Sequence, residues 1–241
     1  MKKPDLIVGL WLIAGLLLLT ALPWTTIVEK LEINRVSLEA ASAYQSGKEL
    51  NYQQVWLDLQ PLADKNCRVN WMIGIIEDSL QVQDRAQASW KKLLDCNEDY
   101  IPLLRWVSND NLELATYAFA LYPQNKSALY WYAEALETQK LKEQTLVVYQ
   151  QLTDLYPLEG LAWCRQGNLQ SGMENWQKAL DAYLQCCYNG DPGVNGCYGA
   201  GRMAEKLNDP QSAIRYYRLS RWQPSRDKAD ELEGNIQIET P

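Results

Sequence analysis

The sequence predicts an all-α fold, an α-solenoid of stacked helical hairpins behind one N-terminal transmembrane helix. The first observation is a spacing of about 34 residues that recurs along the chain, a period typical of helical hairpins. The second is a long uncharged stretch near the N-terminus. Hairpins of this kind bury their apolar faces only by stacking on one another. Six pairs of positions share the spacing: Trp163 and Cys197, Gly167 and Gly201, Ala179 and Ala213, Tyr183 and Tyr217, Tyr149 and Tyr183, and Pro123 and Pro157.

Each repeat carries the same order of residue types, namely large, small, small and aromatic. This pattern resembles the tetratricopeptide repeat family, and the resemblance implies a right-handed solenoid over most of the chain that follows the uncharged stretch. We number positions in each repeat by giving its first small residue position 8. The copies of the pattern are Trp163, Gly167, Ala179 and Tyr183; Cys197, Gly201, Ala213 and Tyr217; Leu129, Ala133, Thr145 and Tyr149; and Trp71, Gly74, Ala86 and Trp90, where Trp71 is one residue out of register.

The small residues have a physical reason to recur. Two helices that cross closely leave no room for a larger side chain at the crossing, and the aromatic residues fill the space between helices. Turn residues separate the helices, and Pro210 is expected to begin one because proline suits the first helical turn. Residues 99–125 carry a degenerate repeat with a short first helix, and residues 34–62 are a further candidate. The alternative is a helical bundle in which the spacing is accidental.

The N-terminal stretch is long enough to cross a membrane. No charged residue lies between Asp5 and Glu29, and about 20 apolar residues span a bilayer core. Lys2 and Lys3 precede the stretch, so the positive-inside rule places the short N-terminus in the cytoplasm and the rest outside it. We expect residues 1–28 to be a cytoplasmic stub and anchor, 29–225 the repeat domain, and 226–241 a capping helix and tail.

Two other interpretations of the N-terminus remain open. A cleaved signal peptide usually has a shorter apolar region followed by two small residues at the cleavage site. Here the apolar run is longer, and Leu19 occupies the first of those two positions. A buried core helix is the third interpretation. The expected location is the plasma membrane, that is the inner membrane of a bacterium, with a single span and the C-terminal domain outside the cytoplasm.

The composition argues against several classes of function. The net charge of −7 disfavours nucleic-acid binding, which needs clustered Lys and Arg. The chain has no histidine, so it lacks the residue on which Ser-His-Asp and Cys-His catalysis and most zinc sites depend. Paired carboxylates could still act as acid and base, but surface helices carry such pairs routinely. We therefore expect a protein that is not an enzyme and that has no metal and no cofactor.

The even number of cysteines, six, favours disulfides in an oxidising compartment. Cys67 at position 1 and Cys96 at position 30 mark two helix ends that meet in a hairpin. The adjacent residues Cys186 and Cys187 point about 100° apart on a helix, so each needs its own partner. The preferred bonds are Cys67–Cys96, Cys164–Cys187 and Cys186–Cys197, although the pairing of the last four cysteines stays open. Buried free thiols and a four-cysteine metal site are the alternatives.

The resemblance also implies where a partner binds, because in this family the first helix of each hairpin lines a concave groove. Carried over by repeat position, the protein-binding groove residues are Tyr130, Glu134, Glu137, Asn168, Ser171, Tyr198, Arg202 and Glu205. This lining is polar and mildly acidic, and it lacks the Lys and Asn set with which some relatives hold a terminal carboxylate. A solvated face without a ligand is the alternative.

Two functions fit these expectations. The first is a membrane-anchored extracytoplasmic scaffold that joins proteins in cell-envelope assembly, surface-polysaccharide export or secretion. The second is an accessory single-pass subunit of an integral membrane complex, whose transmembrane helix makes the main contact. In both cases the partners are proteins and, through the N-terminal helix, the membrane.

Overall fold

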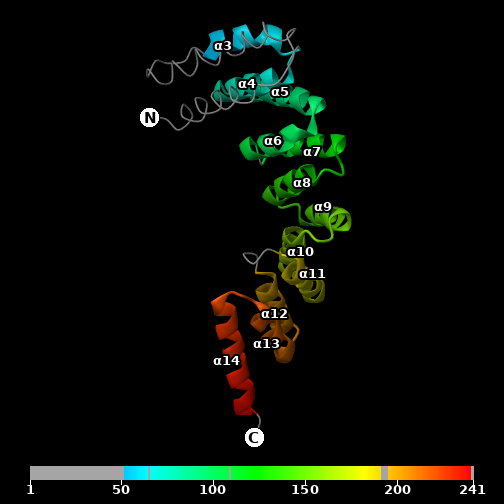
Figure 1. The fold of residues 1–241 in the computed structure, drawn as a ribbon, viewed down its shortest axis with the longest axis vertical. Helices are drawn as coiled ribbons and strands as arrows, with labels where there is room; N and C mark the ends of the chain where they lie inside the picture. The colour runs from blue at the N-terminus through cyan, green and yellow to red at the C-terminus, as the bar shows by residue number, and fades with distance from the viewer. Residues whose placement is uncertain (1–51, 65, 109, 191–194, 240–241) are drawn as a thin grey trace, which may run out of the picture. The chain divides into compact units, whose positions relative to one another are not determined.

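The computed structural model describes residues 52–64, 66–108, 110–190 and 195–239, and over these ranges it contains helices and no strand (Figure 1). The chain divides after Val107 into two compact units, which we describe separately. Among the described residues no helix is long and apolar enough to span a bilayer. The expected anchor at residues 6–28 lies outside the described ranges, as does the first part, residues 34–51, of the candidate repeat at residues 34–62.

The described part of the first unit contains one complete hairpin, α4 and α5. Its described helices are α3 (Tyr52–Leu59), η2 (Gln60–Leu62), α4 (Cys67–Ser79), α5 (Gln83–Cys96), η3 (Glu98–Tyr100) and α6 (Ile101–Val107). Asn66 caps α4, because its side-chain oxygen accepts a hydrogen bond from the Arg68 N–H at 3.0 Å. Glu77 of α4 is buried and accepts hydrogen bonds from the Trp56 indole and the Ser89 hydroxyl, at 2.9 and 2.7 Å. Helices α3, α4 and α5 are thereby joined by one carboxylate.

The second unit contains three consecutive hairpins and a long C-terminal helix. Its helices are α7 (Leu112–Leu121), α8 (Lys126–Thr138), α9 (Lys142–Leu155), α10 (Gly160–Gly172), α11 (Trp176–Asn189), α12 (Gly196–Lys206), α13 (Pro210–Leu219) and α14 (Gln223–Glu239). Each helix packs on its neighbours in sequence, as a repeat architecture requires. The prediction that Pro210 begins a helix is confirmed.

The turns within the hairpins repeat as closely as the helices do. Gln81, Lys140, Glu174 and Asn208 have φ values of 62°, 60°, 60° and 58°, and all four occupy position 15 of their repeats. In each turn, the N–H of the next residue donates to a carbonyl five residues back, as Asn175 does to Gln170 at 2.9 Å. A left-handed residue closing this bond is the Schellman ending of a helix. The same ending therefore closes the first helix of all four hairpins.

The predicted helix crossings are present in both units. A Cβ added to Gly167 would lie 2.7 Å from the Tyr183 ring, and one added to Gly201 would lie 2.5 Å from the Tyr217 ring. A Cβ on Gly74 would collide with the Trp90 indole. Real side chains do not approach this closely, so each aromatic ring at position 24 occupies the space that a side chain at position 8 would need. The repeat pattern inferred from the sequence is confirmed at these hairpins.

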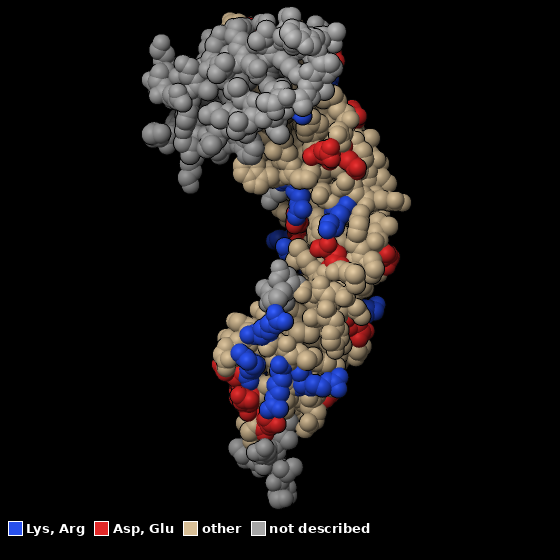
Figure 2. Space-filling model, viewed as in Figure 1, with Lys and Arg blue, Asp and Glu red and all other residues tan. Residues whose placement is uncertain are grey.

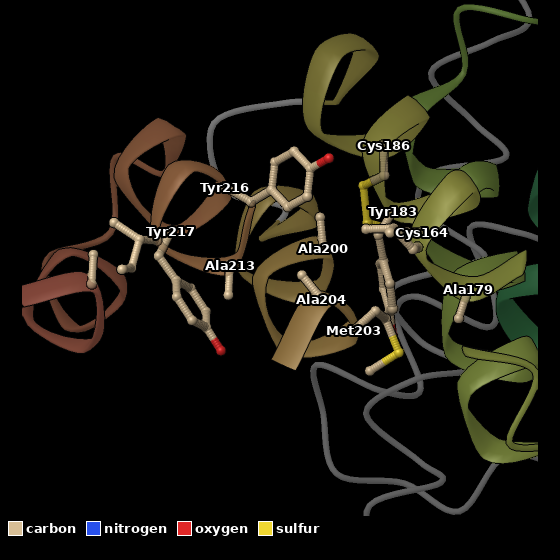
Figure 3. Packing of buried hydrophobic residues seen from close by; sticks show 13 residues of the cluster. Cys164, Ala179, Tyr183, Cys186, Ala200, Met203, Ala204, Ala213, Tyr216 and Tyr217 are labelled. Atoms are coloured by element: carbon tan, nitrogen blue, oxygen red, sulfur yellow. A yellow bond between two sulfur atoms is a disulfide. The ribbon is translucent and has the colours of Figure 1, made fainter. Parts of the chain in front are cut away.

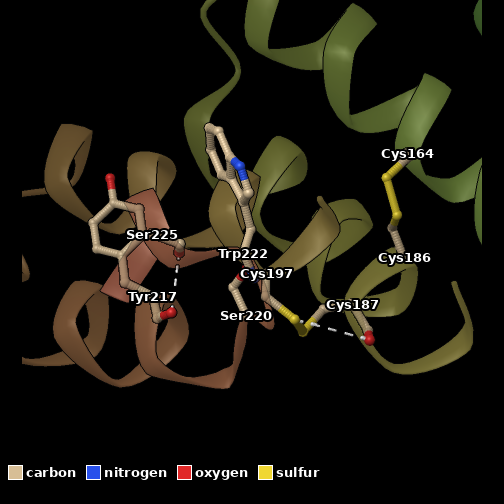
Figure 4. Close-up of a disulfide and its surroundings, with 8 residues drawn as sticks. All are labelled: Cys164, Cys186, Cys187, Cys197, Tyr217, Ser220, Trp222 and Ser225. Carbon is tan, nitrogen blue, oxygen red and sulfur yellow. Dashed lines mark hydrogen bonds between the residues drawn. A yellow bond between two sulfur atoms is a disulfide. The ribbon is translucent and has the colours of Figure 1, made fainter. Parts of the chain in front are cut away.

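Helix α14 covers the last hairpin. Ala229 is fully buried against the core that α12 and α13 form, and Leu232 packs beside it. The buried Ser225 hydroxyl donates to the Tyr217 carbonyl at 3.0 Å (Figure 4). This bond satisfies a carbonyl at the end of α13 and fixes the start of α14 against the last repeat.

Candidate protein-binding surface

The core of the second unit is built on tyrosines at position 24. Tyr149 and Tyr217 are almost completely buried, and Tyr183 lies between Gly167 of α10 and Gly199 of α12, so that a Cβ on either glycine would collide with its ring. Figure 3 shows the side chains of α12 lying between the Cys164–Cys186 disulfide and Tyr183 on one side and the α13 residues on the other. We call Tyr149, Tyr183 and Tyr217 the tyrosine ladder.

Two tyrosine hydroxyls of the ladder donate hydrogen bonds to side chains that were predicted to line the groove. The Tyr183 hydroxyl donates to the Asn168 side-chain oxygen at 2.7 Å, and the Tyr217 hydroxyl donates to Glu205. Glu205 stands at position 12 of its repeat, where the preceding repeat has only Ser171. Tyr183 turns instead to Asn168 at position 9. The core aromatic rings therefore position two of the first-helix side chains that the family resemblance implied for the groove.

The third member of the ladder behaves differently. The buried Tyr149 hydroxyl makes no hydrogen bond of good geometry among the described residues. The negative charge of Glu137 nevertheless acts on this hydroxyl. The Glu137 carboxylate also pairs with the Arg165 guanidinium, at an N–O distance of 3.5 Å. Burial, and secondarily the charge of Glu137, raises the pKa of Tyr149 well above its ordinary value. Burial raises the pKa of Tyr183 and Tyr217 as well, and the bond to Glu205 adds to the rise at Tyr217.

Tyr130, which was predicted to line the protein-binding groove, is buried and therefore less accessible to a partner than the sequence suggested. Only 6% of this residue is exposed, and its hydroxyl donates to Glu159 at 3.2 Å. Lys126 donates to the other Glu159 oxygen at 2.9 Å, and its ammonium lies 5.9 Å from the centre of the Tyr156 ring. This network joins the start of α8 to the start of α10. Tyr130 thus contributes to the contact between successive hairpins.

The remaining predicted groove residues are accessible to different degrees. Asn168 and Arg202 are exposed, while Glu134, Glu137, Ser171, Tyr198 and Glu205 are partly buried. The structure brings Tyr198 and Glu205 together through Tyr217, whose ring centre lies 5.4 Å from that of Tyr198. Arg202 is near enough to Tyr183 and Tyr217 to oppose the rise in their pKa values. A protein-binding role for these residues stays a prediction.

All six cysteines form disulfides, and one of the three predicted bonds is confirmed. Cys67 and Cys96 are bonded, with Cα atoms 6.3 Å apart. The bond joins the start of α4 to the end of α5, as their repeat positions indicated. It closes the open end of a single hairpin.

The predicted pairing of the other four cysteines is wrong. The bonds are Cys164–Cys186 and Cys187–Cys197, with Cα separations of 5.1 and 4.6 Å. Cys186 lies on the same stripe of α11 as Ala179 and Tyr183, and this stripe packs on α10. Cys186 therefore faces Cys164 of its own hairpin, and Cys187, turned by about 100°, faces the next one. Figure 4 shows the two bonds on neighbouring parts of α11.

Other residues near the predicted groove were missed because they lie outside the repeat pattern. Trp222, at the start of the segment leading into α14, packs edge-on against Tyr198 with ring centres 5.0 Å apart. Lys228 of α14 lies close enough to Glu205 and Tyr198 for their charges to act on it. Repeat positions cannot locate a capping helix, because it has no counterpart in the other repeats.

The described residues contain no group of three or more His, Cys, Asp or Glu side chains arranged to hold a metal ion. Four of the carboxylates in this region are already engaged with protein groups: Glu137 with Arg165, Glu159 with Lys126 and Tyr130, Glu205 with Tyr217, and Glu233 with Arg218. The chemistry that the surface offers is hydrogen bonding, ion pairing and aromatic contact, which are the means of recognising another polymer.

No protein-family model and no curated protein matches the sequence. Among solved structures, the chain is similar to PilF of Pseudomonas aeruginosa at 14% identity and a TM-score of 0.48, over 86% of this chain and 98% of that one. It is similar to MamA at 13% identity and a TM-score of 0.43, over 82% and 96%. It is also similar to residues 41 to the end of MamA from Desulfovibrio magneticus RS-1, at 16% identity and a TM-score of 0.43, over 88% of this chain and 97% of that one. At these identities the likeness concerns the fold alone. By its own repeated crossings and turns, the described part of the chain is an array of stacked helical hairpins.

Proposed function

We propose that this chain is a membrane-anchored scaffold that binds protein partners outside the cytoplasm, along the first helices of its hairpins. The observation that carries the proposal is the connection between core and surface in the second unit. Buried tyrosines hold Asn168 and Glu205 through their hydroxyls, so the predicted groove side chains are fixed before a partner arrives. A surface fixed in advance loses less conformational entropy on binding.

The disulfides support the proposed compartment. Three bonds use all six cysteines, and such bonds persist in oxidising environments rather than in the cytosol. Together with the uncharged stretch at residues 6–28, they favour an envelope location with the repeats outside the cytoplasm. A fusion of alkaline phosphatase to Pro241 is expected to be active, and a cytoplasmic reporter at the same place inactive. The reverse pattern would contradict the topology.

Site-specific cross-linking in native membranes tests the scaffold role. A photo-reactive residue at Asn168, which is exposed on α10, is expected to cross-link a partner protein. The matched position is Val147 on α9, the second helix of its hairpin, where 69% of the residue is exposed. A third probe at Leu16 reports contacts of the proposed anchor. Because all three variants keep the full chain, their yields are directly comparable.

Each result separates the scaffold from the accessory-subunit function. Products from Asn168 but not from Val147 support the scaffold. Products from Leu16 alone favour a subunit that joins a membrane complex through its span. The absence of products from Asn168, with the chain folded and located in the membrane, would contradict a binding role for the first helices.

A further inference from the structure

Arginines concentrate at the end of the second unit. Half of the arginines of the chain lie between α12 and the start of α14, at Arg202, Arg215, Arg218, Arg221 and Arg226. Residues 196–228 contain seven basic and three acidic residues, whereas the whole chain has a net charge of −7. Figure 2 shows Lys and Arg side chains gathered over the C-terminal helices on the face in view. The end of the last repeat is therefore a basic region on an acidic protein.

Part of this region is organised around two aromatic rings. We define the C-terminal patch as Tyr198, Arg202, Arg221, Trp222 and Arg226. Trp222 is 43% exposed although its ring packs edge-on against Tyr198. Arg202 lies one helical turn after Tyr198 on α12, while Arg221 directly precedes Trp222 in the sequence and Arg226 follows it by four residues. The patch thus combines a partly exposed aromatic contact with three guanidinium groups from two segments.

Among the described residues, the arginines of the C-terminal patch form no ion pair with a carboxylate. Arg218, outside the patch, pairs with both Asp230 and Glu233. Within the described ranges, neither Arg202 nor Arg221 has an Asp or Glu oxygen within 4.0 Å, and both are exposed. Arg226 donates to the Gln223 amide oxygen at 2.8 Å, which leaves its charge uncompensated. These groups keep their capacity to bind an external anion.

We propose that the C-terminal patch binds an acidic segment of a partner protein, with carboxylates on the arginines and an apolar side chain on the Tyr198–Trp222 pair. The inference rests on the proposed function and names the chemistry of the partner at one end of the groove. Arginine holds a carboxylate through two parallel hydrogen bonds. Arg, Trp and Tyr are also the residues enriched at the energetic centres of protein interfaces.

A protein segment fits the patch better than a phosphate-rich surface. Glu205, Asp209 and Asp227 lie among the basic residues, and Glu205 belongs to the same helix face as Tyr198 and Arg202. A membrane or nucleic acid presents a continuous field of phosphates, which these carboxylates and the net charge of the chain would repel. A short peptide can place its few carboxylates against the arginines and avoid the acidic groups.

Peptide binding by the full chain, held in zwitterionic nanodiscs, tests the proposal. The probe is a fluorescein-labelled dodecapeptide made of Glu, Leu and Tyr, and its counterpart replaces every Glu with Lys. The double variant Arg202→Glu/Arg221→Glu is expected to bind the acidic peptide at least about tenfold more weakly. The matched control Lys92→Glu/Lys178→Glu makes the same charge change at exposed lysines elsewhere and is expected to bind normally.

Two further measurements complete the test. Trp222→Ala leaves the charge unchanged and is expected to weaken binding several-fold, while urea unfolding of each variant checks that the fold is kept. Added salt should weaken the wild-type complex. Flotation with vesicles of phosphatidylcholine, with and without phosphatidylglycerol, measures lipid binding by the same nanodisc-held chain.

The outcomes are distinct. Binding that depends on acidic residues in the peptide and falls in the double variant alone supports the proposal. Equal binding by both double variants, no binding of the acidic peptide, or binding to phosphatidylglycerol vesicles in its place would overturn it. Failure here would leave the cross-links from Asn168 untouched, so it is distinguishable from failure of the scaffold function.

Discussion

Different aromatic residues pack over the position-8 glycine in two hairpins of the molecule. In the α4/α5 hairpin of the first unit the residue is Trp90, and in the α12/α13 hairpin of the second unit it is Tyr217. In both, a ring at position 24 fills the space above a glycine at position 8. Trp90 in α5 buries its indole N–H without a hydrogen-bond partner in the described structure, whereas the Tyr217 hydroxyl reaches Glu205. The ring alone satisfies the helix crossing. A polar atom at its far end additionally links the core to the first-helix surface.

The two hairpins also differ in how they are cross-linked. The first is closed on itself by Cys67–Cys96, while Cys187–Cys197 joins α11 to the hairpin of α12 and α13. One bond stabilises a repeat, and the other fixes the relation between repeats. The comparison suggests that the second unit is organised to hold several hairpins in register, which a binding surface spread over successive repeats requires.

The largest expected effect concerns the disulfides. Replacing Cys67 and Cys96 by Ser should lower the free energy of unfolding by about 3–4 kcal/mol, because the bond closes a loop across 29 residues of sequence separation. Replacing Cys187 and Cys197, only 10 residues apart, should cost about 1 kcal/mol less by the same chain-entropy model. Urea unfolding under non-reducing conditions measures both. An equal or reversed order would show that loop length does not decide the difference.

Next in size is the effect of enlarging a helix crossing. Gly201→Leu should destabilise the chain by about 1–3 kcal/mol, since the Tyr217 ring occupies the space that the new side chain needs. The control is Gly234→Leu in α14, where an added Cβ meets nothing within 4 Å. Thermal unfolding followed by circular dichroism gives the comparison. A wild-type melting temperature for Gly201→Leu would refute the crossing.

Removing single hydroxyls tests whether core and surface are linked. Tyr217→Phe should lose about 1–2 kcal/mol because it breaks a hydrogen bond to a carboxylate. Tyr149→Phe is the matched change at the same repeat position. We expect it to alter stability by less than about 0.5 kcal/mol, since that hydroxyl makes no hydrogen bond of good geometry with the residues that the structure describes. Chemical denaturation of both variants decides. Equal losses would remove the distinction drawn between them.

Alkaline pH should lower the stability of the hairpins that carry Tyr149, Tyr183 and Tyr217 at position 24. It should not lower the stability of the α4/α5 hairpin in this way, because that hairpin carries Trp90 there. Burial raises the pKa of Tyr217 in the folded chain above the value near 10 of an unfolded tyrosine. Folding therefore retains a proton that the unfolded chain releases, so the stabilisation is complete below about pH 10 and is lost as the pH rises further. Each such tyrosine should contribute a loss of up to about 1.4 kcal/mol per pH unit. Urea unfolding at several pH values should show a smaller fall for Tyr217→Phe than for wild type.

The smallest effect concerns the turns that the hairpins share. Gln81, Lys140 and Glu174 hold a left-handed backbone that glycine adopts without strain. Substituting each by Gly should stabilise the chain by about 0.5 kcal/mol. Asn208→Gly should gain less, because asparagine tolerates this conformation. Similar gains at Gln81 and Glu174 would show that the turn is equivalent in both units, and a loss at either would contradict its assignment.

Repeat spacing was sufficient to predict most of the fold. It located the crossings at Gly74, Gly167 and Gly201 and the Cys67–Cys96 bond, because each depends only on position within a hairpin. The preference of proline for the first helical turn located the helix that begins at Pro210. The family resemblance, not the spacing alone, named Asn168 and Glu205, whose side chains accept hydrogen bonds from Tyr183 and Tyr217. The spacing failed for Cys186 and Cys187, because adjacent helical residues point about 100° apart and the repeat period does not specify which of the two faces α10.

The sequence by itself determined the helical hairpins, their period and the positions where helices touch, because a small residue and a ring at fixed spacing leave one compact solution for each crossing. Only the tertiary structure decided which cysteine faces which helix, that Tyr130 is buried against Glu159, and that Trp222 meets Tyr198. These contacts depend on how far each helix is rotated about its axis and on a capping helix outside the repeat. The repeat period specifies neither.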